Sequence, residues 1–170
     1  MSIKGIGAAL IIAGCGGFGY SIAAGIRQQE KLLQQLIHIL QILESELRYR
    51  LTPLPELCAL ACAECDGILH RLFREMTQAL SRQEKPDAAS CMEFVLQQWD
   101  SVPRRMRKHL RYLGKSLGRF DLTGQLEGLQ RVRSACEGDL AMLTRNRDQR
   151  IRSYQTLSLC AGTALAILFV

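Results

Sequence analysis

The sequence predicts an all-α protein, a cytosolic bundle of about six helices flanked by an N-terminal and a C-terminal transmembrane helix. Three observations lead to this prediction. Both ends of the chain are long runs without charge, the middle is rich in the helix-favouring residues Leu, Gln, Arg and Glu, and its apolar residues recur at steps of three and four. We therefore expect a membrane helix at 1–26, a bundle at 27–152 and a second membrane helix at 153–170.

The two uncharged runs have the length that a bilayer demands. Gly5 to Ile26 is 22 residues without a charge, and a helix of that length extends roughly 33 Å. Ser153 to Val170 is 18 residues without a charge, or roughly 27 Å as a helix. Two cleavage alternatives are less favoured. A signal peptide would have a shorter apolar run, and lipoprotein processing at Cys15 would leave 11 further apolar residues behind it.

The charges beside these runs predict the orientation of the chain. Cytoplasmic flanks of membrane helices carry an excess of Lys and Arg. The flank on the far side has Lys4 and the terminal amine, whereas six cations lie beside the middle region: Arg27, Lys31, Arg145, Arg147, Arg150 and Arg152. We therefore expect the middle region to face the cytoplasm.

Proline, glycine and aspartate divide the middle region into helices. The first helix continues from Arg27 to the turn at Thr52, Pro53 and Leu54, because proline disfavours a helical conformation in the residue before it. Further turns are expected at Gly114, Gly118 and Asp121, the last as the cap of the final helix. The expected helices after the first are 54–65, 66–82, 88–99, a fifth that follows Pro103 and ends near Gly118, and 122–152, which continues into the second membrane helix.

Apolar periodicity predicts which helix faces are buried. The first helix carries a leucine stripe and the last carries a similar seam, so we expect these two helices to pack antiparallel with the shorter helices beside them. In the fourth helix Phe94, Val95 and Trp99 are expected to be buried. The expected stripes are Leu33, Leu36, Leu40, Leu43 and Leu47 in the first helix, Met106, Leu110, Leu113, Leu117 and Phe120 in the fifth, and Leu126, Leu129, Val132, Cys136, Leu140 and Leu143 in the sixth.

No motif in the chain indicates an enzyme or a cofactor. Cys58, Cys62 and Cys65 with His70 form the only metal-like cluster, but a structural zinc site normally adds a second ligand pair, so packed apolar cysteines are the better interpretation. There is no GxSxG motif, and Leu113 to Ser116 retains only the last letters of a phosphate-binding loop. We expect no catalytic residue, no bound metal and no cofactor.

Positive charge is the one surface signal. The chain has a formal charge of +6 and a pI of about 9.1, and its densest basic patch is Arg104, Arg105, Arg107, Lys108 and Arg111. The patch can dock an acidic protein, meet anionic lipid, or simply be a solvated helix face. Aromatic residues make up only 6% of the chain, which argues against nucleic acid as a partner.

Several motifs stand in a fixed order along the chain. The segment Glu46 to Leu54 reads E-x-x-Y-x-x-T-P-L, and Leu113 to Asp121 reads L-G-x-x-L-G-x-x-D. Together with Trp99, Gln125 and the apolar tail from Cys160, these motifs resemble the stage III sporulation protein AB family of endospore-forming Firmicutes. The resemblance covers the whole chain.

This resemblance implies a non-enzymatic component of the secretion-like channel complex that joins mother cell and forespore. Its cytosolic bundle would be similar to platform-protein domains of type II secretion and type IV pilus machines. The expected partners are the cytosolic ATPase of the same operon, other membrane subunits of the channel and membrane lipids, in the mother-cell membrane around the forespore. On this hypothesis the basic patch is part of the docking surface. The alternative is a membrane-tethered regulatory or lipid-binding bundle without ATPase contact.

Overall fold

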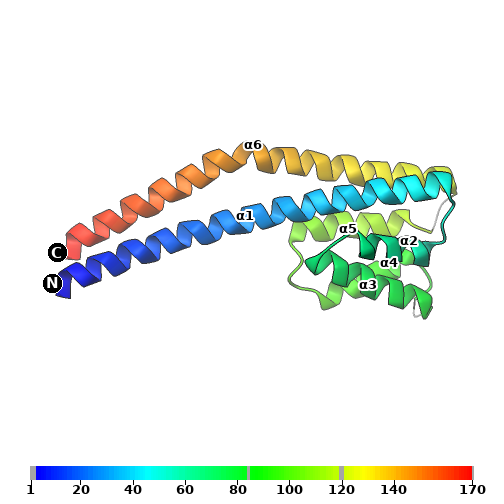
Figure 1. Ribbon diagram of the computed structural model, residues 1–170, viewed down its shortest axis with the longest axis horizontal. Coiled ribbons are helices and arrows are strands. Elements are labelled where there is room, and N and C mark those ends of the chain that lie inside the picture. Colours follow the sequence, from blue (N-terminus) through cyan, green and yellow to red (C-terminus); the bar gives the residue numbers. More distant parts are fainter. Residues whose placement is uncertain (1–2, 84, 119–120, 170) are drawn as a thin grey trace. The chain divides into compact units, whose positions relative to one another are not determined.

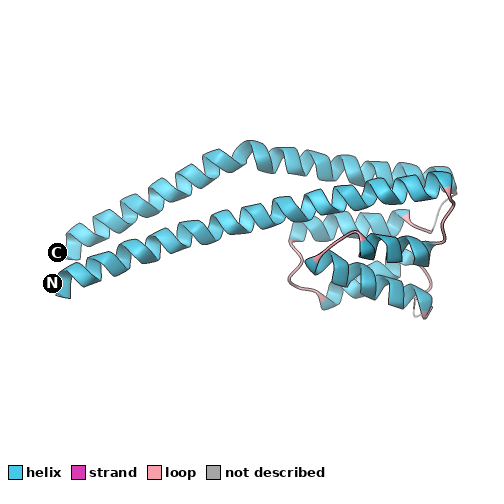
Figure 2. Ribbon diagram, viewed as in Figure 1, coloured by secondary structure: helices cyan, strands magenta, loops and turns pink. Residues whose placement is uncertain are grey.

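The computed structural model consists of six α-helices, with no strand in the residues that it describes, which confirms the predicted all-α class (Figures 1 and 2). It describes the backbone of residues 3–83, 85–118 and 121–169. Within these ranges it describes the side chains of residues 24–145 and of positions 153, 156, 157, 160 and 164.

The helix boundaries agree closely with those predicted from the turn residues. The sixth helix continues without a break toward the C-terminus, as predicted. The helices are α1 (Ile3–Tyr49), α2 (Leu54–Ala63), α3 (Gly67–Ser81), α4 (Ala88–Gln98), α5 (Arg104–Ser116) and α6 (Leu122–Phe169).

The chain divides into two compact units, and α1 and α6 contribute to both. One unit consists of Met1–Glu30 and Ala141–Val170, and the other is Lys31–Leu140. In the part of the chain that the structure describes, no helix combines the length and apolar character of a membrane span. The side chains of residues 1–23 and most of those after 145 lie outside the described residues. The membrane helices expected at 1–26 and 153–170 therefore stay predictions.

Within Lys31–Leu140, the described parts of α1 and α6 run side by side and antiparallel (Figure 1). This arrangement confirms the packing predicted from their apolar seams. The shorter helices pack in sequence order, α2 against α3, α3 against α4 and α4 against α5. Fully buried side chains from all six helices contribute to the core, including Leu36, Ile39, Leu40 and Leu43 of α1, Leu57 of α2, Leu69, Leu72, Phe73 and Met76 of α3, Met92 and Leu96 of α4, Leu110 of α5, and Leu129 and Cys136 of α6.

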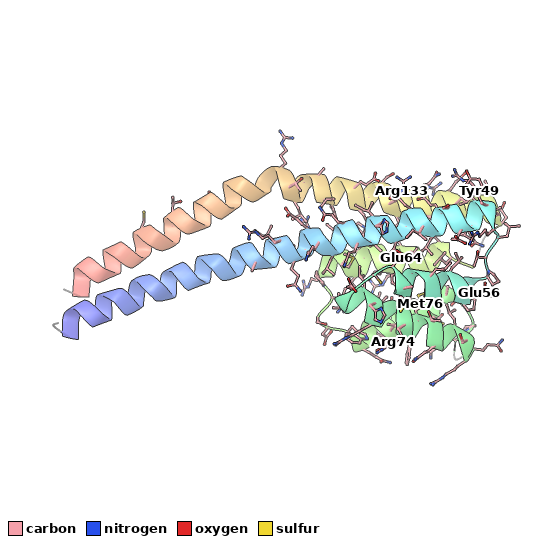
Figure 3. The ribbon with its side chains drawn as sticks, in the orientation of Figure 1. Tyr49, Glu56, Glu64, Arg74, Met76 and Arg133 are labelled. Atoms are coloured by element: carbon pink, nitrogen blue, oxygen red, sulfur yellow. The ribbon has the colours of Figure 1, made fainter. Side chains whose placement is uncertain are left out.

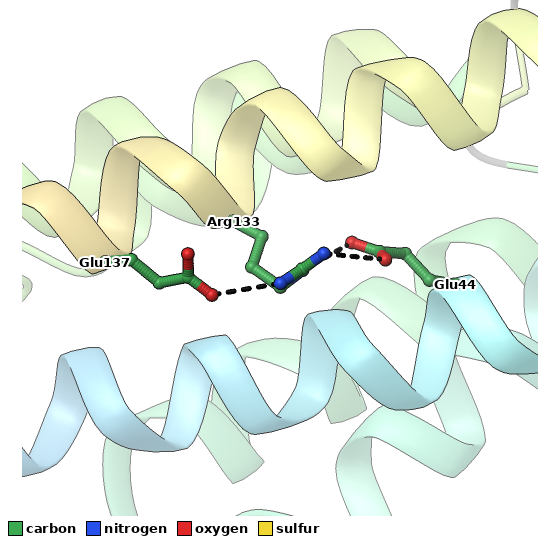
Figure 4. A network of polar contacts seen from close by, with 3 residues as sticks. All are labelled: Glu44, Arg133 and Glu137. Carbon is green, nitrogen blue, oxygen red and sulfur yellow. Dashed lines mark hydrogen bonds and ion pairs between the residues drawn. The ribbon is translucent and has the colours of Figure 1, made fainter.

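A polar contact also joins α1 to α6. The guanidinium of Arg133 donates to both carboxylate oxygens of Glu44, at 2.9 and 3.3 Å, and to Glu137 Oε1 at 3.0 Å (Figure 4). Glu44 is buried, so this two-point bond provides the charge compensation that burial of a carboxylate needs. The contact specifies the register of α1 against α6, because a shift of either helix would leave Glu44 buried without a cation.

The loop between α1 and α2 contains the predicted proline turn. Thr52 Oγ1 donates to Glu46 Oε2 at 3.1 Å, and Pro53 precedes the first residue of α2, Leu54. Leu51 has a φ of 54°, and both Leu51 and Tyr49 are exposed (Figure 3 labels Tyr49 at the end of α1). The chain reverses here because a left-handed residue ends α1 and proline then prevents the helix from continuing.

The turn before α6 is formed by glycine and aspartate. Gly118 has a φ of 77°, a conformation in which glycine has no side chain to strain the backbone. Asp121 Oδ1 accepts the backbone N–H of Gly124 at 3.1 Å and so caps α6. Phe120, which the periodicity assigned to the apolar stripe of the fifth helix, lies outside the described residues.

Two predictions about individual positions were wrong. Gly114 does not form a turn but lies inside α5, because its missing side chain lets α5 approach α4. A Cβ there would lie 2.6 Å from Met92 Cβ. Phe94 and Trp99 are only half-buried. Lys85 Nζ lies 5.1 Å from the centre of the Phe94 ring, and Trp99 Nε1 donates to Glu75 at 2.7 Å, so both rings stay at the surface, where polar groups reach them.

Candidate functional site

The helix α5 carries the predicted basic patch, and its sequence separates into three faces. Met106, Leu110 and Leu113 point into the core, which the steps of four and three place on one side of the helix. The face toward α4 contains Arg107 and Gly114, and the face toward α6 contains His109 and Ser116. The remaining face, opposite the core, is open to solvent.

Only cations occupy that solvent face. Arg104, Lys108, Arg111 and Lys115 follow one another at steps of four, three and four residues, so they form one line along the helix. We call these four residues the cationic stripe. All four are exposed, and α5 contains no carboxylate that could neutralise them within the helix.

Arg111 is the member of the stripe that a neighbouring helix neutralises. Its Nε and Nη2 donate to the two carboxylate oxygens of Glu93 on α4, at 2.6 and 2.8 Å. This hydrogen bond lowers the pKa of Glu93 below its ordinary value, and the charges of Arg111, Lys115 and Arg107 lower it further. Arg111 is therefore held against α4, while Arg104, Lys108 and Lys115 make no ion pair with any residue that the structure describes.

The other two residues of the predicted patch lie beside the stripe. Arg107 donates to the backbone carbonyl of Trp99 at 2.9 Å and lies 3.6 Å from Asp100, so it links α5 to the end of α4. Arg105 Nη1 lies 4.0 Å from Asp139 of α6. The patch predicted from the sequence thus separates into the exposed Arg104, Lys108 and Arg111 and two laterally held arginines. Lys115 was missed, although its spacing from Lys108 and Arg111 gives the signal.

A groove lies between α5 and α6, next to the stripe. Its volume is about 600 Å³, and its lining includes Tyr112 and Ser116 of α5 with Gly128, Val132 and Ala135 of α6. His109 Nε2 and Asp139 Oδ2 lie 2.9 Å apart and connect the two helices. The sequence did not predict this groove, because its two sides belong to different helices and meet only when α5 and α6 pack together.

In the cluster of Cys58, Cys62, Cys65 and His70, side chains hydrogen-bond to backbone carbonyl groups, as packed side chains commonly do. His70 Nδ1 lies 2.9 Å from the backbone oxygen of Cys62, and Cys65 Sγ donates to the carbonyl of Ala61. Burial raises the pKa of the Cys58 thiol to about 12, with nearby Cys91 adding to the effect. Among the residues that the structure describes, no group of three or more His, Cys, Asp or Glu side chains is arranged to hold a metal ion.

Comparison with known proteins identifies relatives of the chain. No curated protein sequence matches it. A solved structure of stage III sporulation protein AB is similar at a TM-score of 0.62 and 22% sequence identity, over 69% of this chain and 94% of that one. At 22% identity this match shows that the two chains share a fold. The family model for stage III sporulation protein AB matches residues 4–170, so the chain belongs to the stage III sporulation protein AB family.

Proposed function

We propose that the chain is a non-enzymatic, membrane-anchored component of the channel-like secretion complex between mother cell and forespore. Membership of the stage III sporulation protein AB family supports the role in sporulation. In this proposal the bundle Lys31–Leu140 is a platform that links a cytosolic ATPase to the membrane subunits of the complex.

The cationic stripe is the observation that supports the proposed contact with the ATPase. Arg104, Lys108 and Lys115 are exposed on a helix whose opposite face is anchored by buried leucines, so the charges are held in a line on a rigid support. Such a line attracts an acidic surface and steers its approach. The proposed docking set is Arg104, Arg105, Arg107, Lys108 and Arg111 from the sequence, together with Lys115.

The anchoring part of the proposal rests on the uncharged runs at 5–26 and 153–170 and on the cations beside them. It places the protein in the mother-cell membrane around the forespore, with the bundle facing the cytoplasm. A reporter fused near Lys85 tests the orientation. Activity of a cytoplasm-specific reporter is expected, and labelling of the reporter from outside intact cells would contradict it.

A charge-reversal experiment tests the docking contact. The double variant Arg104→Glu/Lys108→Glu is expected to abolish co-purification of the operon's ATPase with the full-length chain and to lower spore yield. The matched control is Arg48→Glu/Arg74→Glu, which changes the net charge equally at two exposed cations on α1 and α3 (Arg74 is labelled in Figure 3). Unchanged ATPase capture and sporulation in the stripe variant would remove the docking hypothesis.

The second candidate is a membrane-tethered bundle whose stripe meets anionic lipid without any ATPase contact. The same observation favours it, because each cation near an anionic surface contributes about 1 kcal/mol. Flotation with vesicles that contain anionic lipid, compared with neutral vesicles, separates the two candidates. Vesicle binding that the stripe variant loses, together with absence of the ATPase from the purified complex, would favour the lipid function.

A further inference from the structure

We propose that the groove between α5 and α6 binds an acidic amphipathic helix of a protein partner. This inference deepens the proposed function and rests on it for the statement that α5 meets another protein. It adds the shape and chemistry of the element that docks there.

The groove has the dimensions of a helix-binding site. It encloses about 600 Å³, and its lining on α6 extends from Gly124 to Ala135. These twelve residues of α-helix correspond to roughly 18 Å, which is about three turns of a second helix lying alongside. Two of its lining residues bring α5 and α6 close together, since a Cβ on Gly128 would lie 2.6 Å from Ser116 Cβ. Gly124 and Ala135, which also line the groove, have little or no side chain to keep a third backbone at a distance.

Four polar side chains of the lining already have partners. Ser116 Oγ donates to the carbonyl of Tyr112 at 2.9 Å, and Glu127 holds Arg131 at 3.2 Å. His109 is bonded to Asp139. What the groove offers to a ligand is therefore mainly apolar surface, including half of the Tyr112 side chain, which is 51% exposed. Apolar side chains on one face of a helix are the ligand that such a surface favours.

The charges around the groove select an acidic partner. On the α5 side the groove borders the cationic stripe, where Lys108 and Lys115 make no ion pair with any described residue. The two carboxylates on the α6 side, Glu127 and Asp139, each contact a cation of this chain already. A docking helix with carboxylates flanking its apolar face would complement this pattern, whereas a basic helix would be repelled.

Binding of designed peptides to the full-length chain tests the proposal. The probe is a helix-forming peptide with leucines at i, i+4, i+7 and i+11 and glutamates on both flanks. One control peptide replaces every glutamate by lysine, and a second has the same composition with its leucines scattered around the helix. The acidic amphipathic peptide is expected to bind at least about tenfold more tightly than either control, measured by fluorescence anisotropy.

Two variants of the chain locate the binding site. Ala135→Trp fills the groove and is expected to weaken binding of the acidic peptide by about tenfold or more. Gln130→Trp adds the same side chain at an exposed position of α6 that does not line the groove, and is expected to bind as wild type does. Both positions are exposed, and circular dichroism with thermal unfolding verifies that both variants are folded.

Several results would overturn the inference. Wild-type affinity in Ala135→Trp would place the peptide elsewhere, and equal binding of the scattered peptide would reduce the interaction to charge alone. If the chain self-associates and Ala135→Trp abolishes this self-association, the occupant of the groove is a second copy of the chain. The proposed function fails separately. Peptide binding in the groove without co-purification of the ATPase would leave the inference standing and remove the ATPase link. Capture of the ATPase by Ala135→Trp at the wild-type level would leave the ATPase link standing and remove the groove as its binding site.

Discussion

Leu51 and Gln83 have φ values of 54° and 51°, and each lies two residues beyond the last residue of a helix, α1 and α3 respectively. A left-handed residue at this position closes the end of a helix, and glycine is the usual choice because a side chain there costs about 1 kcal/mol. At Leu51 the strained residue also presents an exposed apolar side chain next to the Thr52–Pro53 turn.

Substitution of Gln83 tests this local strain. Gln83→Gly is expected to raise the free energy of unfolding by about 1 kcal/mol, because glycine adopts the left-handed conformation without a steric cost. Gln83 is exposed, so no packing is lost. The matched control, Gln78→Gly, places glycine at an exposed position inside α3 and should lower stability by about 1 kcal/mol. Urea unfolding measures both, and a loss of stability in Gln83→Gly would contradict the argument.

The bond between Arg111 and Glu93 predicts a pH dependence of stability. Because the bond lowers the pKa of Glu93 from its ordinary 4.5, Glu93 stabilises the fold above pH 4.5, and this contribution is lost as the pH falls through the lowered pKa. Glu93→Gln should therefore unfold at lower urea concentration than wild type near neutral pH, with the difference disappearing in strong acid. Glu56→Gln, which removes an exposed carboxylate from α2, is the control. A difference that persists unchanged in acid would contradict the prediction.

At the scale of elements, two glycines, which have no side chain, determine how closely α5 packs against its neighbouring helices. Gly114 permits the approach of α4, and Gly128 permits the approach of α6 to Ser116. Met92, which faces Gly114, is fully buried, so it has little room to move away. The position of α5, and with it the cationic stripe and the groove, therefore depends on glycine at positions 114 and 128.

Gly114→Ala is expected to lower the free energy of unfolding by roughly 1–3 kcal/mol, because the new methyl group overlaps the Cβ of Met92. Gly138→Ala in α6 is the control. No heavy atom lies within 4 Å of its added Cβ, so its expected effect is a gain of about 0.5–1 kcal/mol from helix propensity. Thermal and urea unfolding measure both. Equal effects of the two substitutions would show that α5 does not pack against Met92 as described.

The bond between Arg133 and Glu44 is the second contact between elements. Arg133→Leu leaves the buried carboxylate of Glu44 without its cation and is expected to cost roughly 2–3 kcal/mol. The double variant Glu44→Leu/Arg133→Leu should be more stable than Arg133→Leu, since it removes the orphaned charge. Arg131→Leu, at an exposed pair with Glu127, is the control, with an expected change below about 1 kcal/mol. A double variant whose free energy of unfolding does not exceed that of Arg133→Leu would argue against the pairing.

At the scale of the whole molecule, the core belongs to one unit. Among the described residues, every buried apolar side chain lies between Leu32 and Cys136, inside the unit Lys31–Leu140. A segment that contains its complete core can fold without the rest of the chain.

The fragment 31–140 is therefore expected to be helical and to unfold in one cooperative transition, with a free energy of roughly 5–15 kcal/mol. Circular dichroism and urea unfolding test this expectation. A shorter fragment, 54–118, lacks the leucines of α1 and the buried residues of α6 and is expected to lose the cooperative transition. Cooperative unfolding of the shorter fragment, or a non-cooperative 31–140, would contradict the assignment of the core.

Much of this architecture could be predicted from local signals. Pro53 and Pro103 mark the starts of α2 and α5, Asp87 and Asp121 cap α4 and α6, and leucine periodicity identified the core face of α1. These signals act within a few residues of the chain, so they are visible in the sequence. Gly114 was misassigned to a turn, because a glycine that permits close packing and a glycine that ends a helix look alike in a sequence.

The sequence by itself determined the helices and their order, because backbone sterics and apolar periodicity are properties of neighbouring residues. Its apolar seams also indicated the antiparallel packing of α1 and α6, and its motifs indicated the family. Only the tertiary structure decided which cations are neutralised, since the partners Glu93 and Asp139 belong to other helices than Arg111 and Arg105. It also decided the groove, whose walls meet only when α5 and α6 pack. Such contacts depend on side chains distant in the chain, and no local pattern encodes them.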